Sequence, residues 1–158
     1  MDSFIQKVGH VMMWSNGLLI FAIIIQVVLR YGFGKGLVVL EELQWHLYAV
    51  GIMFGASYAM TLDSHIRVDI VHARLSEKWR NRWDLFGIIF LLLPFTFIIF
   101  HQSLDFVWEA WRVGESSDAP SGLPFRWAIK SVIPISFGLL GVATISRAIR
   151  IIHFLKRG

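Results

Sequence analysis

Two histidines stand at positions where they could bind a cofactor. His46 and His101 each lie a few residues inside the same end of a long apolar segment, on two different segments of the chain. Two imidazoles at similar depth on different membrane helices can ligate a haem, as in membrane cytochromes of the b type. The chain offers only this one pair, and no glycine stands where a macrocycle would need close approach. We therefore expect both histidines to bond to neighbouring helices, and we keep a haem-binding electron-transfer anchor as the alternative function.

Carboxylates provide two further arrangements that could do chemistry. Asp105 and Glu109 are four residues apart, on one face of a helix, and paired carboxylates can transfer protons. A polar group in the middle of the chain contains Asp63, His65, Asp69 and His72. Its spacing matches no familiar metal-binding motif, and carboxylates at a membrane boundary usually bond to solvent or to a partner. The chain has no cysteine, which excludes thiolate ligands and nucleophiles. We expect no catalytic residue, no metal site and no cofactor.

Four long apolar segments determine the environment of these side chains. A helix needs about 20 apolar residues to span the hydrocarbon core of a bilayer. The sequence has four such stretches, at about 9–30, 42–62, 84–106 and 128–150, and 56% of its 158 residues are hydrophobic. The first run is too long for a signal peptide and lacks a small-residue cleavage site, so we expect an uncleaved helix. The sequence predicts an all-α integral membrane protein, a single membrane domain over residues 1–158 with four transmembrane helices.

Basic residues are distributed unevenly between the two sides of these spans. Four spans place both termini and the middle loop on one side of the membrane. Ten of the 15 Lys and Arg residues fall on that side: Lys7, Arg67, Arg74, Lys78, Arg80, Arg82, Arg147, Arg150, Lys156 and Arg157. Because cytoplasmic loops carry the excess of Lys and Arg, both termini and the middle loop are predicted to be cytoplasmic. Such flanks also account for the net charge of +4 without a nucleic-acid partner.

The middle loop has the pattern of a short amphipathic helix. Apolar residues recur on one helical face at Val68, Val71, Leu75 and Trp79. This spacing predicts an interfacial helix at about residues 66–76, lying on the cytoplasmic surface of the membrane. Ser76 followed by Glu77 has the character of a helix N-cap, so the third helix is expected to begin there. The residues expected at the lipid interface are Arg74, Lys78, Trp79, Arg80, Arg82 and Trp83.

The third helix is predicted to run from about Glu77 to Trp111, which is longer than a bilayer requires. We expect a kink at Pro94, because proline removes a backbone hydrogen bond.

Glu41 and Glu42 open the second helix, where the helix dipole and unpaired N–H groups favour carboxylates. Their position also makes them candidates for docking a partner on the outer face.

Several short motifs in combination resemble those of a known family. They are EELQWHL at residues 41–47, DSHIRVD at 63–69, GLPFRW at 122–127 with Lys130 after it, and PISFG at 134–138. Together they resemble the small membrane subunit, the DctQ component, of tripartite ATP-independent periplasmic (TRAP) transporters. The resemblance covers nearly the whole chain, except that residues 143–158 add little beyond their hydrophobic character.

The resemblance implies a function and a set of partners. It implies a small permease subunit, not an enzyme, in a sodium-coupled secondary transporter of the bacterial inner membrane. A large multispanning subunit would bind substrate and sodium, and a soluble periplasmic binding protein would deliver an organic acid. The small subunit would be a membrane scaffold for the large one. The candidate partner-interface residues are Glu41, Glu42, Trp45, His46, Arg126 and Lys130.

Overall fold

Long helices account for almost all of the chain that the structure describes. The computed structural model describes residues 2–61 and 76–157. The helices are α1 (Asp2–Gly32), α2 (Val38–Thr61), α4 (Glu77–Gly87), the π-helix η1 (Ile88–Leu92), α5 (Leu93–Arg112) and α6 (Arg126–Arg157). The all-α prediction is confirmed. The predicted interfacial helix at 66–76 lies outside the described residues except for Ser76, and so does Arg74.

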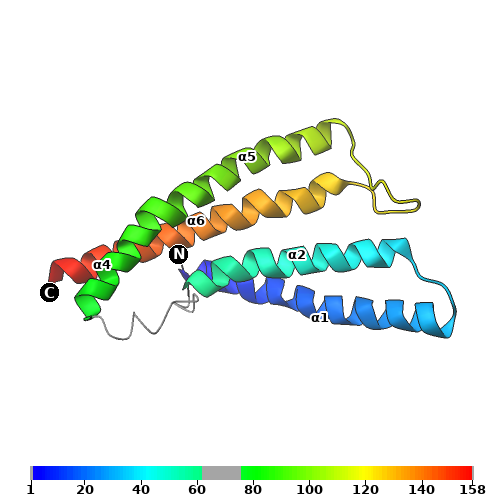
Figure 1. Cartoon of the computed structure of the whole chain (residues 1–158), viewed down its shortest axis with the longest axis horizontal. Helices are drawn as coiled ribbons and strands as arrows, with labels where there is room; N and C mark the ends of the chain where they lie inside the picture. The colour runs from blue at the N-terminus through cyan, green and yellow to red at the C-terminus, as the bar shows by residue number, and fades with distance from the viewer. Residues whose placement is uncertain (1, 62–75, 158) are drawn as a thin grey trace.

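The helices form four rods in the order α1, α2, α6 and α4–η1–α5 (Figure 1). Neighbouring rods are antiparallel except α2 and α6, which both run from the loop connections toward the end that holds the termini. Both termini lie at one end of the bundle, and the connections 33–37 and 113–125 lie at the other. Below, these are called the terminal end and the loop end. Three rods are long and apolar enough to cross a membrane: Ser3–Gly32, Glu77–Arg112 and Arg126–Lys156. The fourth, α2, has 24 residues and lies between α1 and α6. Four long rods agree with the predicted number of helices.

The outer surface of the bundle is too apolar for a protein surrounded by water. Aromatic and aliphatic side chains project outward, and Phe90, Leu91 and Phe97 are 63%, 68% and 67% exposed. Exposed apolar patches this extensive cause aggregation in water but are well solvated by lipid chains. The buried apolar cluster is small by comparison and gathers residues such as Ile5, Met60 and Ile151 toward the terminal end. The surface therefore fits a protein that lipid surrounds.

Small and polar residues bring the helices together. A Cβ on Gly9 would lie 2.8 Å from the Tyr58 Cβ atom, so α1 and α2 touch closely there. The Ser57 hydroxyl of α2 donates a buried hydrogen bond of 3.0 Å to the Ser136 carbonyl of α6. The Gln44 amide donates to the Ala22 carbonyl of α1 at 3.3 Å. Lipid tails are as apolar as leucine, so helices in a membrane associate through close packing and polar contacts of this kind.

The rod formed by α4, η1 and α5 changes its helical register just before Pro94. Leu93 donates its N–H to the Ile88 carbonyl, five residues back, which is the bond of a π-helix. Pro94 then occupies the first turn of α5, where a missing N–H costs least. The rod bends where α4 passes into α5 (Figure 1). The expected kink is present, and the wide turn ahead of the proline accommodates it.

Gly9 provides a test of the α1–α2 contact. Gly9→Ala should destabilise the purified protein in detergent by about 1–3 kcal/mol, because the added methyl group overpacks a contact with the Tyr58 Cβ atom that cannot rotate away. Gly55→Ala on α2 is the matched control, since its Cβ would meet nothing within 4 Å. Thermal unfolding followed by tryptophan fluorescence measures both. Equal melting temperatures for the two variants would show that the contact does not hold the helices.

Candidate functional site

Glu42 joins α2 to the long connection at the loop end. One of its carboxylate oxygens accepts a hydrogen bond from the Ser117 hydroxyl, and the other accepts one from the Leu123 N–H at 2.6 Å. Ser117 also donates its N–H to the Leu123 carbonyl at 3.1 Å, which closes the connection into a small loop. One carboxylate thus holds both sides of this loop against the first turn of α2.

The space beside this carboxylate admits only glycine at position 122. A Cβ on Gly122 would lie 2.4 Å from the Ser117 side chain and 2.9 Å from a Glu42 oxygen. The loop backbone is also held in uncommon conformations, with φ of 64° at Ser121 and 59° at Phe125. Non-glycine residues adopt such φ values only where surrounding contacts impose them. The motif GLPFRW therefore forms a constrained turn packed on Glu42.

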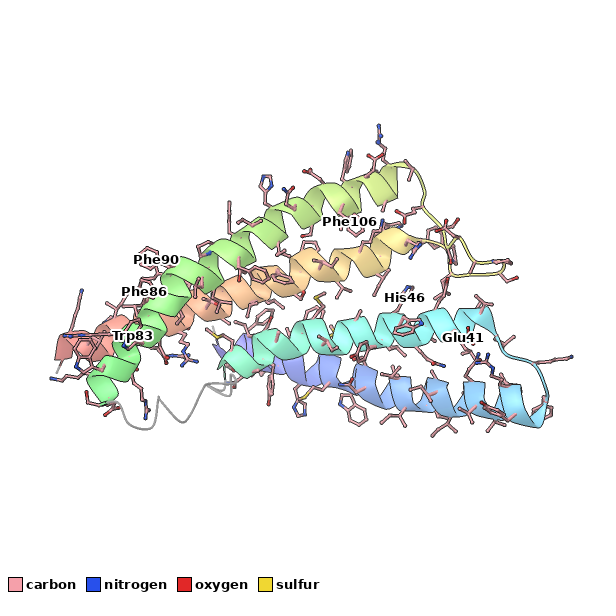
Figure 2. All side chains as sticks on the ribbon, viewed as in Figure 1. Glu41, His46, Trp83, Phe86, Phe90 and Phe106 are labelled. Atoms are coloured by element: carbon pink, nitrogen blue, oxygen red, sulfur yellow. The ribbon has the colours of Figure 1, made fainter. Side chains whose placement is uncertain are left out.

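Glu115 binds two basic residues of α6 on the other side of the same connection. Its carboxylate pairs with Lys130, and its second oxygen lies 3.8 Å from the Arg126 guanidinium. The Glu115 carbonyl also accepts a hydrogen bond from the Arg126 N–H at 3.0 Å. The Lys130 ammonium lies 3.8 Å from the ring centroid of Phe106 on α5, a cation–π contact (Figure 2). These contacts tie α5, α6 and their connection into one unit.

Glu41 faces a different neighbour from Glu42 and stabilises the α1–α2 hairpin. It accepts a hydrogen bond of 3.0 Å from the buried Gln26 amide and lies 3.6 Å from the Arg30 guanidinium. The Gln26 side-chain oxygen in turn accepts the Leu37 N–H at 3.2 Å. The two adjacent carboxylates therefore fasten the two connections of the loop end, one each.

The structure brings most of the predicted partner-interface residues into contacts within the chain. Glu41, Glu42, Arg126 and Lys130 all have the ion pairs or hydrogen bonds described above. Trp45 differs from them, since it is 71% exposed on the outer surface of α2. His46 is half-buried on the side of α2 that faces α6 (Figure 2). Contact of these residues with another protein stays a prediction.

An ion pair at the terminal end was missed from the sequence. The Arg147 guanidinium of α6 donates to the Asp84 carboxylate of α4 at 3.2 Å, and the two side chains are 8% and 19% exposed. The residues are 63 positions apart, and each lies at the edge of an apolar run, so only their matched depth in two antiparallel spans could have suggested the pair. The contact neutralises the most buried charge of α6.

The predicted lipid-interface residues within the described part lie at this same end. Trp79 and Trp83 are 53% and 57% exposed, and the Arg82 guanidinium lies 5.2 Å from the centroid of the Trp79 ring. Lys78 and Arg82 are exposed, and Arg80 is half-buried. Trp83 begins an aromatic row that continues through Phe86 and Phe90 along the rod (Figure 2). Tryptophan at the headgroup level, with phenylalanine deeper along the helix, is typical of a membrane boundary. Contact of these residues with lipid stays a prediction.

The geometry gives no support to a haem shared by His46 and His101 or to a paired role for Asp105 and Glu109. His101 is exposed on α5, its ring 6.3 Å from Phe97 of the same helix, and α6 lies between α5 and the helix that carries His46. The two histidines are therefore not on neighbouring helices, as a shared haem would require. Glu109 pairs with Arg112 at 2.7 Å on the exposed surface instead of with Asp105. Within residues 2–61 and 76–157, no three potential ligands gather to hold a metal ion. The polar group of Asp63, His65, Asp69 and His72 lies outside these residues.

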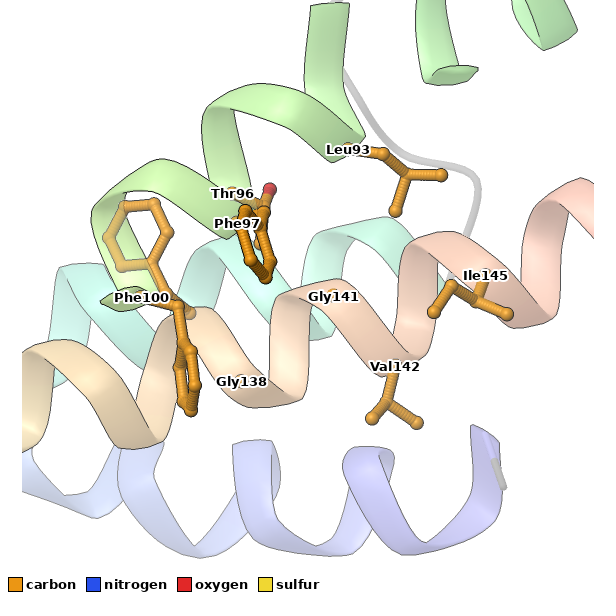
Figure 3. Close-up of a pocket in the computed structure, with 9 residues that line it drawn as sticks. Leu93, Thr96, Phe97, Phe100, Gly138, Gly141, Val142 and Ile145 are labelled. Atoms are coloured by element: carbon orange, nitrogen blue, oxygen red, sulfur yellow. The ribbon is translucent and has the colours of Figure 1, made fainter. Parts of the chain in front are cut away.

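An apolar groove of about 400 Å³ runs between α5 and α6 (Figure 3). Gly138 and Gly141 form its floor on α6, and Phe97 and Phe100 line the α5 side. The Thr96 hydroxyl at its edge is buried and has no hydrogen-bond partner within the described part of the chain. Glycines that open a smooth surface on a membrane helix allow another helix to approach closely.

Removal of the Glu42 carboxylate should loosen the connection 113–125 at the loop end. Glu42→Ala removes the acceptor for the Ser117 hydroxyl and the Leu123 N–H, so amide hydrogen exchange in residues 113–125 should become several-fold faster. Glu41→Ala is the control, because its contacts lie in the α1–α2 hairpin. Hydrogen-exchange mass spectrometry in detergent micelles measures both. Unchanged exchange at Leu123 in Glu42→Ala would contradict the bracing role.

The Asp84–Arg147 pair should be more sensitive to the loss of one partner than to the loss of both. Asp84→Leu leaves the buried Arg147 without this carboxylate and should cost on the order of 1–3 kcal/mol. The double variant Asp84→Leu/Arg147→Leu should recover part of that loss, since no buried charge remains. Thermal unfolding in detergent compares the three proteins. A double variant no more stable than Asp84→Leu would argue against a direct pair.

Comparison with known proteins identifies the family. A search of curated proteins found no match. A family model, the DctQ component of the tripartite ATP-independent periplasmic transporters, matches residues 19–154, which cover parts of all four rods and both polar ends. The chain therefore belongs to the DctQ family of tripartite ATP-independent periplasmic transporters.

Proposed function

We propose that this chain is the small permease subunit of a sodium-coupled TRAP transporter that takes up an organic acid, and that it acts as a membrane scaffold for the large subunit. It would lie in the bacterial inner membrane with both termini cytoplasmic. Membership of the DctQ family supports the association with a large membrane subunit and a binding protein. The scaffold role is supported by the distribution of charge along the helices.

Charged residues are confined to the two ends of the bundle. Lys, Arg, Asp and Glu are absent from residues 8–29, 43–61, 85–104 and 131–146. Transport pathways through membranes are usually marked by ionisable residues and broken helices near the midplane. Two polar side chains that lie between the helices, Ser57 and Gln44, bond to backbone carbonyls of neighbouring helices. This pattern favours a rigid support over a route for an anion.

The α2 helix completes the scaffold as a fourth span. Its 24 residues correspond to about 36 Å of helix, enough for a bilayer core. Its polar residues face neighbours, since Gln44 bonds to α1 and Ser57 to α6. A span that is less apolar in composition is acceptable where its polar groups are satisfied inside the bundle.

We assign the α5–α6 groove as the binding site for a helix of the large subunit. Its glycine floor permits close helix packing, and its lining is almost wholly apolar, as suits a membrane helix of another subunit. At the loop end, the exposed Trp45 ring beside the braced loop provides a second contact surface for the large subunit or the binding protein. The internal contacts of Glu42 and Arg126 would hold that surface in shape.

Co-purification with the large subunit tests the scaffold proposal. The affinity-tagged chain, co-expressed with the large TRAP membrane subunit of the same genome, should retain that subunit in mild detergent. Gly141→Leu should reduce its recovery several-fold, because the new side chain fills the groove. Gly17→Leu on α1 is the control, since its Cβ meets only the Trp14 ring, at 4.0 Å.

The outcomes distinguish failure of the scaffold proposal from failure of the groove assignment. If the unaltered chain retains no large subunit, the scaffold proposal fails. If Gly141→Leu and Gly17→Leu retain it equally, the large subunit binds elsewhere and only the groove assignment fails. The melting temperature of each isolated variant is measured as well, because a Cβ at position 141 would already lie 3.5 Å from Thr96 Cγ2 of α5. Loss of recovery supports the groove assignment only in a variant that melts like the unaltered protein; Gly138→Ala, whose Cβ would lie 3.4 Å from the rotatable Phe100 ring, is the milder second variant.

A further inference from the structure

We propose that a polar pocket between α4 and α6 binds the phosphate group of an anionic phospholipid. The pocket lies at the terminal end and encloses about 380 Å³. Three of its lining residues are arginines, Arg80 from α4 and Arg147 and Arg150 from α6, and Asn81 adds an amide. This site is independent of the transporter function, since it requires only that the two helices lie in a membrane.

The charges around the pocket favour an anion. Three guanidinium groups face two carboxylates, those of Glu77 and Asp84. Asp84 holds Arg147 by the ion pair of 3.2 Å, which fixes this guanidinium at the wall of the pocket. A guanidinium has five N–H donors, more than one carboxylate can accept, and its planar shape suits phosphate oxygens. Arginines from two helices therefore converge on a volume suited to one phosphate group.

The surroundings favour a lipid over a soluble phosphate. The pocket lies where two membrane-crossing rods reach their ends, so its depth is that of a headgroup. Phe154 lines it, and the exposed Trp83 and Phe86 continue along α4 toward the centre of the bundle. A phospholipid can place its phosphate among the arginines and lay its chains along these apolar side chains. Basic pockets between membrane helices are known to hold anionic headgroups in this way.

Lipid binding to the purified chain tests the site. The protein, delipidated in detergent, is titrated with phosphatidylglycerol or with phosphatidylcholine of the same acyl chains, and native mass spectrometry counts the bound molecules. One phosphatidylglycerol should bind more tightly than phosphatidylcholine. Arg80→Gln/Arg150→Gln should weaken that first binding by roughly tenfold or more, since each basic residue near an anionic surface contributes a factor of about five. Arg147 is left unchanged because it is paired inside the bundle.

A matched control separates the pocket from general charge. Lys7→Gln/Lys156→Gln removes the same charge at the same end from exposed residues that do not line the pocket. This variant should bind phosphatidylglycerol like the unaltered chain. Equal losses in both double variants, or equal binding of the two lipids, would overturn the proposal. Displacement of phosphatidylglycerol by inorganic phosphate would also overturn it, because the pocket would then be a site for a soluble anion.

Discussion

The absence of water in the hydrocarbon core is the constraint on which the rest of this structure depends. A polar group at that depth has to find its partner inside the protein. The chain meets this requirement by keeping Lys, Arg, Asp and Glu out of the central residues of all four rods. Two of the smaller polar groups that remain, Ser57 and Gln44, bond to backbone carbonyls of adjacent helices, so they join helices and satisfy their own polar atoms by the same contact. The buried hydroxyls of Ser15, Thr96 and Thr144 have no hydrogen-bond partner within the described part of the chain.

The two ends of the bundle solve different problems. At the loop end, Glu41 and Glu42 lie next to each other in sequence but fasten separate connections, so the shape of that surface is set by internal bonds. At the terminal end, the Asp84–Arg147 pair joins α4 to α6 beside the exposed tryptophans Trp79 and Trp83. The loop end also carries exposed tryptophans, since Trp108 and Trp111 are 58% and 57% exposed. Both ends therefore have aromatic residues of the kind found at headgroup boundaries.

Local signals in the sequence predicted much of this fold. The helix begins at Glu77, as the Ser76–Glu77 pair predicted, although the Ser76 side chain makes no capping hydrogen bond. The bend near Pro94 was predicted from the missing N–H of proline. The π-helix ahead of the bend could not be predicted, because no short sequence pattern distinguishes a π-helical turn from an α-helical one. The partners of Glu42 and Arg147 lie 81 and 63 residues away, and no spacing rule connects residues so distant. The candidate partner-interface residues lie near the helix ends, while the bonds that four of them make within the chain could be found only in the structure.

We propose that this chain supports a transporter without carrying substrate itself. Sodium-driven uptake of a radiolabelled organic acid into proteoliposomes tests it most directly, with the large subunit, the binding protein and this chain added in combination. The complete set should take up the acid, omission of this chain should cause a large loss of uptake, and this chain with the binding protein alone should give none. Uptake by this chain without the large subunit, or full uptake when this chain is omitted, would rule out a supporting role without substrate transport.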